Sequence, residues 1–180
     1  MPGPVFLEGD RLDLRPLERE DLELVQRARN DPTIRERLTF STPSSMDDVE
    51  EFYENVVLGE DSVNLVVTVD GDPAGTVVLF DLSRHAAELA VWLLPEFQGE
   101  GYGREASGLL VGHGFEGLGL HRIRAKALRD NDASRTMLES LGFQEVGVAR
   151  DTVFQRGRYH DMVRYDLLAD EWLAEGAARA

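Results

Sequence analysis

Cysteine is absent from the 180-residue sequence, which excludes disulfide bonds and a thiol nucleophile. No apolar run approaches the roughly 20 residues that a membrane-spanning helix needs. The first residues also lack the basic region followed by an apolar region that marks a secretory signal peptide. From these absences we expect a soluble cytoplasmic protein with no membrane partner.

Positive charge is scarce as well. The chain has 34 aspartate and glutamate residues against 19 lysine and arginine residues, its net charge is −15 at pH 7, and Lys126 is its only lysine. A surface of this sign excludes general binding to nucleic acid or anionic lipid, both of which require basic patches. Two explanations of the acidity stay open: a halophilic protein kept soluble at high salt, and an ordinary acidic surface encoded by a GC-rich genome.

Apolar residues alternate in some segments and recur at helical spacing in others, which predicts one α+β domain over residues 1–180 with a mixed sheet. The first helix is expected to stop at Asp31-Pro32, and residues 70–75 to form a hairpin turn. The predicted strands are residues 10–18, 63–69, 76–82, 87–94, 121–130, 143–152 and 160–168. The predicted helices are residues 19–31, 44–59, 103–119, 132–142 and 170–180. The order before the last helix is β α α β β β α β α β β.

Three glycines, Gly99, Gly101 and Gly103, separate the strand at residues 87–94 from the helix that follows. Glycine lets backbone N–H groups approach a ligand closely, and a helix N-terminus adds partial positive charge, so this junction predicts an anion site. Arg104 stands in the first turn, against the helix dipole, where a bound anion would compensate it. The spacing fits neither a P-loop nor the G-x-G-x-x-G fingerprint. A loop that only allows close packing of the helix is the open alternative.

The junction also carries a family resemblance. Residues 98–103, Gln-Gly-Glu-Gly-Tyr-Gly, match the pattern Q/R-x-x-G-x-G/A of the GNAT-superfamily N-acetyltransferases. Further segments that agree in order and spacing are residues 7–25, 91–103, 129–143 and 147–172. Nearly the whole chain therefore resembles this family, in the branch that contains the ribosomal-protein-alanine N-acetyltransferases. The resemblance implies a mixed, mostly antiparallel sheet flanked by helices, whose strands at residues 87–94 and 121–130 diverge at a bulge.

The resemblance further implies an enzyme that moves an acetyl group directly from acetyl-CoA to a primary amine, either a protein N-terminus or a small amine. The pantetheine arm would lie between the diverging strands, and the N–H of Leu93 would stabilise the oxyanion of the thioester carbonyl. The implied cofactor-binding residues are Leu93, Leu94, Gln98, Gly99, Gly101, Tyr102, Gly103, Arg104, Asn131 and Arg135. Two of them have open alternatives: Asn131 as a helix N-cap, and Arg135 as a solvated surface residue.

Acetyl transfer requires that the amine lose a proton and that the departing thiolate gain one. Relatives use a tyrosine at the position of Leu138, so Ser134 is the remaining candidate for the proton donor. One face of the strand at residues 121–130 carries no carboxylate, and Glu88 on the preceding strand is our candidate base, acting directly or through a water. A surface role for Glu88 stays open. So does a non-catalytic module that binds or senses acyl-CoA.

The partners are less constrained. The four histidines lack metal-ligand spacing, so we expect no metal. We expect residues 33–45 and the loop at residues 157–160 to face the acceptor amine. An acidic rim would favour a cationic acceptor, such as a basic peptide or a polyamine. Monomer and homodimer both stay open.

Overall fold

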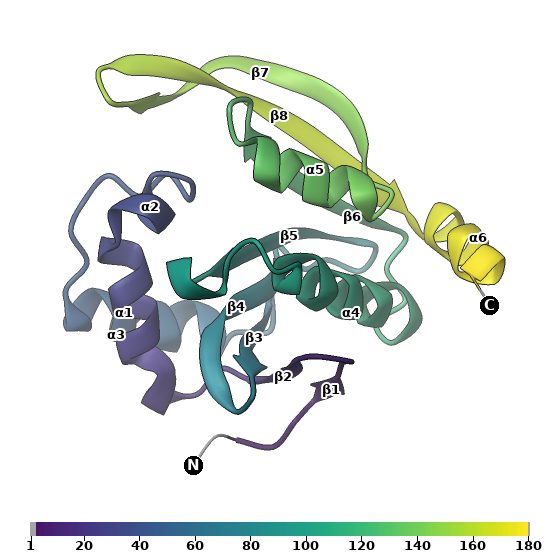
Figure 1. The fold of residues 1–180 in the computed structure, drawn as a ribbon, viewed down its shortest axis with the longest axis horizontal. Helices are drawn as coiled ribbons and strands as arrows, with labels where there is room; N and C mark the ends of the chain where they lie inside the picture. Colours follow the sequence, from purple (N-terminus) through teal and green to yellow (C-terminus); the bar gives the residue numbers. More distant parts are fainter. Residues whose placement is uncertain (1–2, 180) are drawn as a thin grey trace.

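The computed structural model describes residues 3–179, with side chains up to residue 174. Its strands form one sheet in the order β1-β2-β3-β4-β5-β6-β8-β7, in which β5 and β6 are parallel and the other neighbours are antiparallel. The strands are β1 (Leu7–Glu8), β2 (Asp13–Pro16), β3 (Val63–Val69), β4 (Asp72–Phe80), β5 (Ala86–Leu93), β6 (Arg122–Leu128), β7 (Gln144–Gln155) and β8 (Arg158–Leu168). The predicted fold class is confirmed (Figure 1).

Helices cover both faces of this sheet. They are α1 (Leu22–Asn30), α2 (Pro32–Arg35), α3 (Met46–Phe52), α4 (Tyr102–Glu116), α5 (Asp132–Ser140) and α6 (Ala169–Arg179). A 3-10 turn (Arg19–Asp21) precedes α1, a π-helical turn (Tyr53–Val57) extends α3, and another 3-10 turn (Pro95–Phe97) follows β5. None of the helices in the described part of the chain has the length and apolarity to cross a membrane.

The two larger core clusters lie on opposite faces of the sheet, as the alternation of side chains along each strand requires. In β3, Leu65 and Val67 join the larger core, which also contains Leu110 of α4 and Leu138 of α5. Val66 points the other way, into a cluster with side chains of α1 and α3, among them Val49. The helices α4 and α5 therefore cover one face, and α1 and α3 cover the other.

The first helix ends where the sequence predicts, since α1 stops at Asn30 with Asp31 as its C-cap. A second short helix, α2, then starts at Pro32, and the Asp31 carboxylate caps it by accepting the backbone N–H groups of Thr33 (2.8 Å) and Ile34 (3.2 Å). The predicted hairpin between β3 and β4 is also present, but its turn is shorter than expected: it contains only Asp70 and Gly71, whose φ angles are 53° and 86°. The first strand is also divided, with the short β1 pairing onto β2.

The parallel pair β5–β6 separates partway along its length. Its last paired residues are Leu89 and Ala125, although β5 continues to Leu93 and β6 to Leu128. This is the divergence that the resemblance implies. The bulge that the resemblance implies at this divergence is not found in the described pairing, because neither β5 with β4 nor β6 with β8 shows a register shift. Beyond that point β5 remains paired with β4 as far as Leu93, and β6 remains paired with β8 as far as Leu128.

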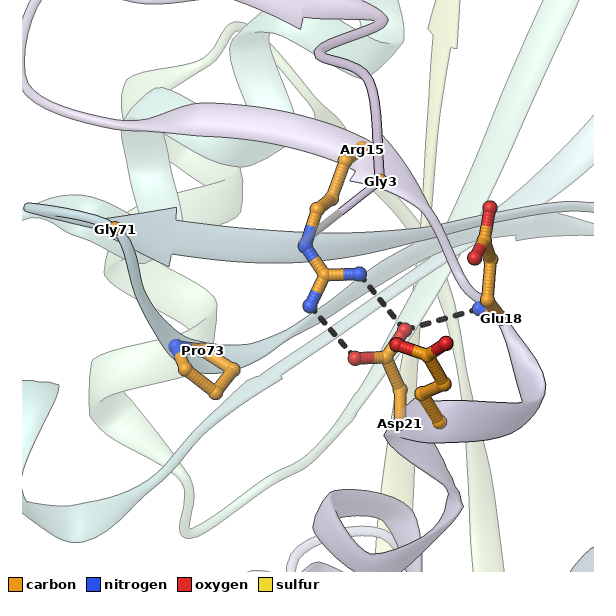
Figure 2. Close-up of a pocket in the computed structure, with 7 residues that line it drawn as sticks. Gly3, Arg15, Glu18, Asp21, Gly71 and Pro73 are labelled. Atoms are coloured by element: carbon orange, nitrogen blue, oxygen red, sulfur yellow. Dashed lines mark hydrogen bonds and ion pairs between the residues drawn. The ribbon is translucent and has the colours of Figure 1, made fainter. Parts of the chain in front are cut away.

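Arg15 of β2 and Asp21 of the 3-10 turn before α1 form an ion pair with two hydrogen bonds (Figure 2). Nη1 of Arg15 donates to Oδ2 of Asp21 over 2.8 Å and Nη2 to Oδ1 over 2.6 Å, while the backbone N–H of Glu18 donates to Oδ2 over 3.0 Å. Arg15 is 6% exposed and Asp21 is 7% exposed. The hydrogen bonds to Asp21 raise the pKa of Arg15. The pair thus fixes β2 to the start of α1.

Removing one partner would leave a buried charge without its counter-charge. We therefore expect Asp21→Ala to lower the free energy of unfolding by about 3 kcal/mol. The double variant Arg15→Met with Asp21→Leu, which replaces the pair by apolar side chains, should recover most of that loss. Urea unfolding followed by circular dichroism measures both changes. A single variant as stable as the parent would show that the pair does not hold β2 to α1.

Candidate functional site

A cleft of about 760 Å³ opens where β5 and β6 diverge. The N-terminal end of α4, the inner side of α5 and residues 34–40 complete its walls. It brings together nine of the predicted site residues: Glu88, Leu93, Gln98, Gly99, Gly101, Gly103, Arg104, Asn131 and Ser134. Leu94, Tyr102 and Arg135 are not among the described residues that line it.

The edge of β5 that faces the cleft has unpaired backbone groups. Residues of an antiparallel strand alternate between its two neighbours, and Leu94 donates its N–H to the carbonyl of Ala74 over 2.8 Å, on the β4 side. Val91 and Leu93 therefore turn their N–H groups toward β6. Because the ladder between these strands stops at Leu89, the described residues of β6 give those two N–H groups no partner. The carbonyl of Leu93 accepts the side-chain amide of Gln98 over 2.8 Å.

The glycine loop closes one end of the cleft. Gly99 and Gly101 take φ angles of 86° and 85°, a conformation that side chains with a Cβ adopt only at a cost. Gly101 is the N-cap of α4 and supplies no side-chain hydrogen bond, in contrast to the caps Asp31 of α2 and Asn131 of α5. The first N–H groups of α4 lack intrahelical partners, as at any helix start, so they remain available to an anion.

Arg11, in the turn between β1 and β2, supports this loop from behind. Its Nη1 donates to the carbonyl of Glu100 over 2.9 Å, and its backbone N–H and Nε donate to the Glu105 carboxylate, each over 2.8 Å. Its guanidinium also lies 5.1 Å from the ring centroid of Tyr102. Sequence reasoning missed Arg11, because nothing local to residue 11 indicates a partner about ninety positions away.

Arg104 lines the cleft and has a partner of its own. Its Nε donates to Oγ of Ser140 over 3.0 Å, and its Nη2 donates to the Ser140 carbonyl over 3.3 Å. The carbonyl and hydroxyl of Ser140, the last residue of α5, thus accept the cation that stands unfavourably at the start of α4. Arg104 therefore already has a compensating partner within the protein.

Asn131 and Ser134 occupy the start of α5. The side-chain oxygen of Asn131 accepts the N–H of Ser134 over 3.3 Å, which confirms the N-cap role that the sequence left open. The same oxygen accepts Nη1 of Arg37 over 3.4 Å, so a cation from the segment after α2 reaches across the cleft. Sequence reasoning did not single out Arg37.

Arg135 lies on the opposite side of α5. Its Nε donates to the hydroxyl of Tyr165 over 3.0 Å, and this hydrogen bond raises the pKa of Arg135. The hydroxyl in turn donates to Glu139 over 3.2 Å, and burial raises the pKa of Tyr165. The guanidinium therefore serves the contact between α5 and β8, and the expectation that it faces the cofactor has no support in this geometry.

Glu88 faces the cleft from β5 and is paired with the only lysine of the chain. Its side chain is 14% exposed, and Nζ of Lys126 lies 2.9 Å from its Oε1 in an ion pair whose geometry is not that of a hydrogen bond. Nζ also lies 5.8 Å from the ring centroid of Phe80. The sequence did not predict the pairing of Lys126 with Glu88, because that pairing depends on the parallel register of β5 and β6.

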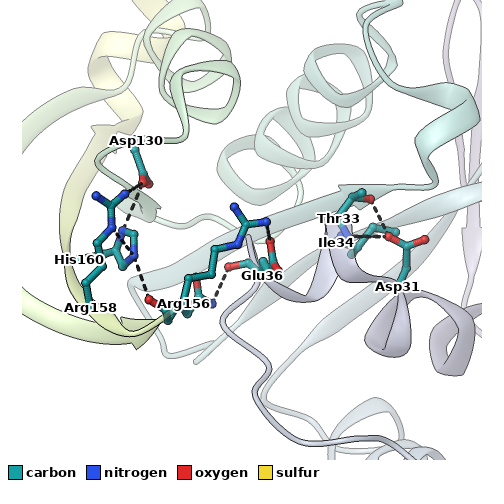
Figure 3. A network of polar contacts seen from close by, with 9 residues as sticks. Asp31, Thr33, Ile34, Glu36, Asp130, Arg156, Arg158 and His160 are labelled. Carbon is teal, nitrogen blue, oxygen red and sulfur yellow. Dashed lines mark hydrogen bonds and ion pairs between the residues drawn. The ribbon is translucent and has the colours of Figure 1, made fainter.

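Residues 34–40 form one wall of the cleft, and the tip of the β7–β8 hairpin holds this wall (Figure 3). The Gln155 side chain donates to the carbonyl of Glu36 over 2.6 Å, and Arg156 pairs with the Glu36 carboxylate. His160 lies with Nδ1 3.2 Å from Asp130. The predicted wall at residues 33–45 is therefore present in part. The loop at residues 157–160 supports the site without lining the described cleft.

Known proteins resemble this chain in sequence and in fold. Residues 11–144 match the acetyltransferase (GNAT) domain family. Spermidine N(1)-acetyltransferase of Escherichia coli K12 is 29% identical over 165 residues, which cover 90% of this chain and 88% of that protein. Putative ribosomal N-acetyltransferase YdaF of Bacillus subtilis 168 is 31% identical over 176 residues, covering 93% and 96%. The crystal structure of Vibrio cholerae spermidine N-acetyltransferase with CoA and spermine has a TM-score of 0.86 and 28% identity, covering 91% and 98%.

The glycine loop can be tested with two matched variants. Gly99 and Gly71 both have φ 86°, and a Cβ added at either would meet nothing within 4 Å. Gly99→Ala and Gly71→Ala should therefore each cost about 1 kcal/mol of stability through the same backbone strain. Only Gly99→Ala should also weaken coenzyme A binding, by about tenfold, because relief of the strain moves the N–H groups of the loop. Calorimetric titration measures this affinity, and equal affinity in both variants would exclude the loop from binding.

Proposed function

The chain belongs to the GNAT acetyltransferases, and we propose that its cleft between β5 and β6 is the site where it transfers an acetyl group from acetyl-CoA to a primary amine. One observation carries this assignment. The N–H groups of Val91 and Leu93 face the cleft without partners on β6, and the uncapped start of α4 lines the same cleft. An extended amide-containing chain that ends in phosphates is complementary to that arrangement.

We assign the two ends of acetyl-CoA to different parts of the cleft. The amides of its pantetheine arm pair with the open edge of β5 around Val91 and Leu93. Its diphosphate lies against the N–H groups of the glycine loop, with Arg104 beside it. The proposed binding residues are Leu93, Gln98, Gly99, Gly101, Gly103, Arg104 and Asn131. Arg11 acts indirectly, by fixing the loop through Glu100 and Glu105.

The proposed chemistry uses two side chains that line the cleft. The neutral amine attacks the thioester carbon, its excess proton passes to Glu88 directly or through a water, and the thiolate leaves as the carbonyl reforms. The N–H of Leu93 is placed to stabilise the oxyanion between these events. Ser134 then donates its hydroxyl proton to the thiolate and regains a proton from solvent. An α-amine with a pKa near 8 needs less help from Glu88 than an alkylamine with a pKa near 10.4.

For the acceptor we propose a small amine. Support comes from relatives over nearly the full chain that are named for spermidine, and from a structure of one of them with spermine. A relative named as a putative ribosomal N-acetyltransferase makes a protein N-terminus the competing acceptor. Coenzyme A release from a panel of small amines and of peptides with free N-termini distinguishes the two. Faster turnover of the peptides would reject the small-amine proposal.

The catalytic assignment is tested with Ser134→Ala. Because the variant cannot protonate the leaving thiolate, we expect kcat to fall about 100-fold while the affinity for acetyl-CoA stays unchanged. Ser83→Ala removes a hydroxyl from the turn before β5, outside the cleft, and serves as the control. Thiol release gives kcat, and calorimetry gives the affinity. A protein that binds acetyl-CoA but releases no thiol with any amine would instead be a binding or sensing module.

A further inference from the structure

The side chains around Glu88 form a site for an ammonium group, and the chain fills this site itself. A carboxylate beside the face of an aromatic ring is a common way for a protein to bind an alkylammonium ion. Here Glu88 supplies the carboxylate and Phe80 supplies the ring, since these two residues lie opposite each other on β5 and β4. Nζ of Lys126 occupies the position between them, 2.9 Å from the carboxylate oxygen and 5.8 Å from the ring centroid.

All three residues line the cleft, and Lys126 comes directly after the last paired residue of β6. The lysine therefore stands where the two strands begin to separate. Its side chain is 54% exposed, whereas that of Glu88 is 14% exposed. The carboxylate is thus mostly buried, and its only described ion pair is with a cation that solvent and small molecules can reach.

The charged side chains that line the cleft determine which acceptors it can bind. Although the chain has a net charge of −15, Glu88 is the only carboxylate among the described residues that line the cleft. Three cations line it as well, namely Arg37, Arg104 and Lys126. An acceptor with a second ammonium group would find no free carboxylate there, and it would meet the charge of Lys126 at close range.

From this geometry we infer that Lys126 takes the place of a substrate ammonium group and makes the enzyme selective for acceptors that carry a single positive charge. The inference deepens the proposed function and rests on it. A diamine or polyamine whose reacting amine lies next to Glu88 therefore brings its second charge against a cation that the chain itself holds there at a high effective concentration. Such selectivity would separate this chain from its relatives that are named for spermidine.

The apolar part of the cleft suits the same class of acceptor. Phe40, Phe80 and Trp92 line it together with Leu38 and Met162. These side chains favour an amine with an apolar body over one with several charged groups. Selectivity thus has an attractive component, the aromatic wall, and a repulsive component, the lysine.

The test compares two acceptors of equal chain length, n-butylamine and 1,4-diaminobutane, at low ionic strength, where charge effects are least screened. The quantity measured is the ratio of kcat/KM for the diamine to kcat/KM for the monoamine. The native protein should favour the monoamine. Lys126→Met keeps an unbranched apolar side chain similar in length to the aliphatic part of lysine but removes the charge, and it should raise the ratio about tenfold or more.

Two control variants show whether the effect depends on a positive charge at position 126 or on the net charge of the strand. Lys126→Arg keeps a cation beside Glu88 and should leave the ratio within about twofold. Arg124→Gln removes one positive charge from the same face of β6, where Arg124 pairs with Asp81 outside the cleft, and should also leave the ratio unchanged. Lys126→Gln repeats the neutralisation with a polar side chain, in case the methionine disturbs packing. Unaltered affinity for acetyl-CoA confirms that each variant is folded.

The outcomes separate this inference from the proposed function. An equal ratio in the native protein and both neutral Lys126 variants, or a native preference for the diamine, would overturn the role of Lys126 while leaving acetyl transfer intact. A rise of the same size in Arg124→Gln would also overturn it, since general charge would then explain the effect. A native protein that acetylates neither amine nor any peptide would reject the proposed function itself.

Discussion

The site depends on one feature of the sheet: the hydrogen-bonded pairing between the parallel strands β5 and β6 ends before either strand does. Buried backbone N–H and C=O groups are almost always paired, and a strand edge that lacks a neighbour must find another partner. Here β5 loses β6 after Leu89, while its other edge stays fully paired with β4. The fold thereby places an open strand edge inside a cleft, where an extended ligand could complete the pairing.

The rest of the site compensates for the negative field of the chain. An anion that approaches a protein with a net charge of −15 is repelled at long range, so local donors must provide the attraction. Backbone N–H groups do this without adding charge, and left-handed glycines let them converge. The basic residues have fixed partners: Arg11 holds the glycine loop, and Arg104 is held by the end of α5. Lys126, the only lysine of the chain, also lines the cleft, and its side chain is more than half exposed.

Much of the fold was predictable because it is local. Alternating apolar residues indicated the strands, and glycines indicated the loop before α4. The site could be predicted only in part, because its remaining features depend on register. Glu88 meets Lys126 since β5 and β6 are parallel, and Arg135 turns toward Tyr165 since β8 lies beside β6. No periodicity in the sequence reports which distant strands become neighbours, so Arg11, Arg37 and the orientation of Arg135 were out of reach.

Residue-resolved hydrogen exchange tests the central claim most directly. If a bound chain completes the open edge of β5, saturating acetyl-CoA will slow exchange at the N–H groups of Val91 and Leu93. The alternate residues Ala90 and Trp92 face β4 and are already paired, so their exchange should change much less. Equal slowing at all four positions, or none at Val91 and Leu93, would contradict the account.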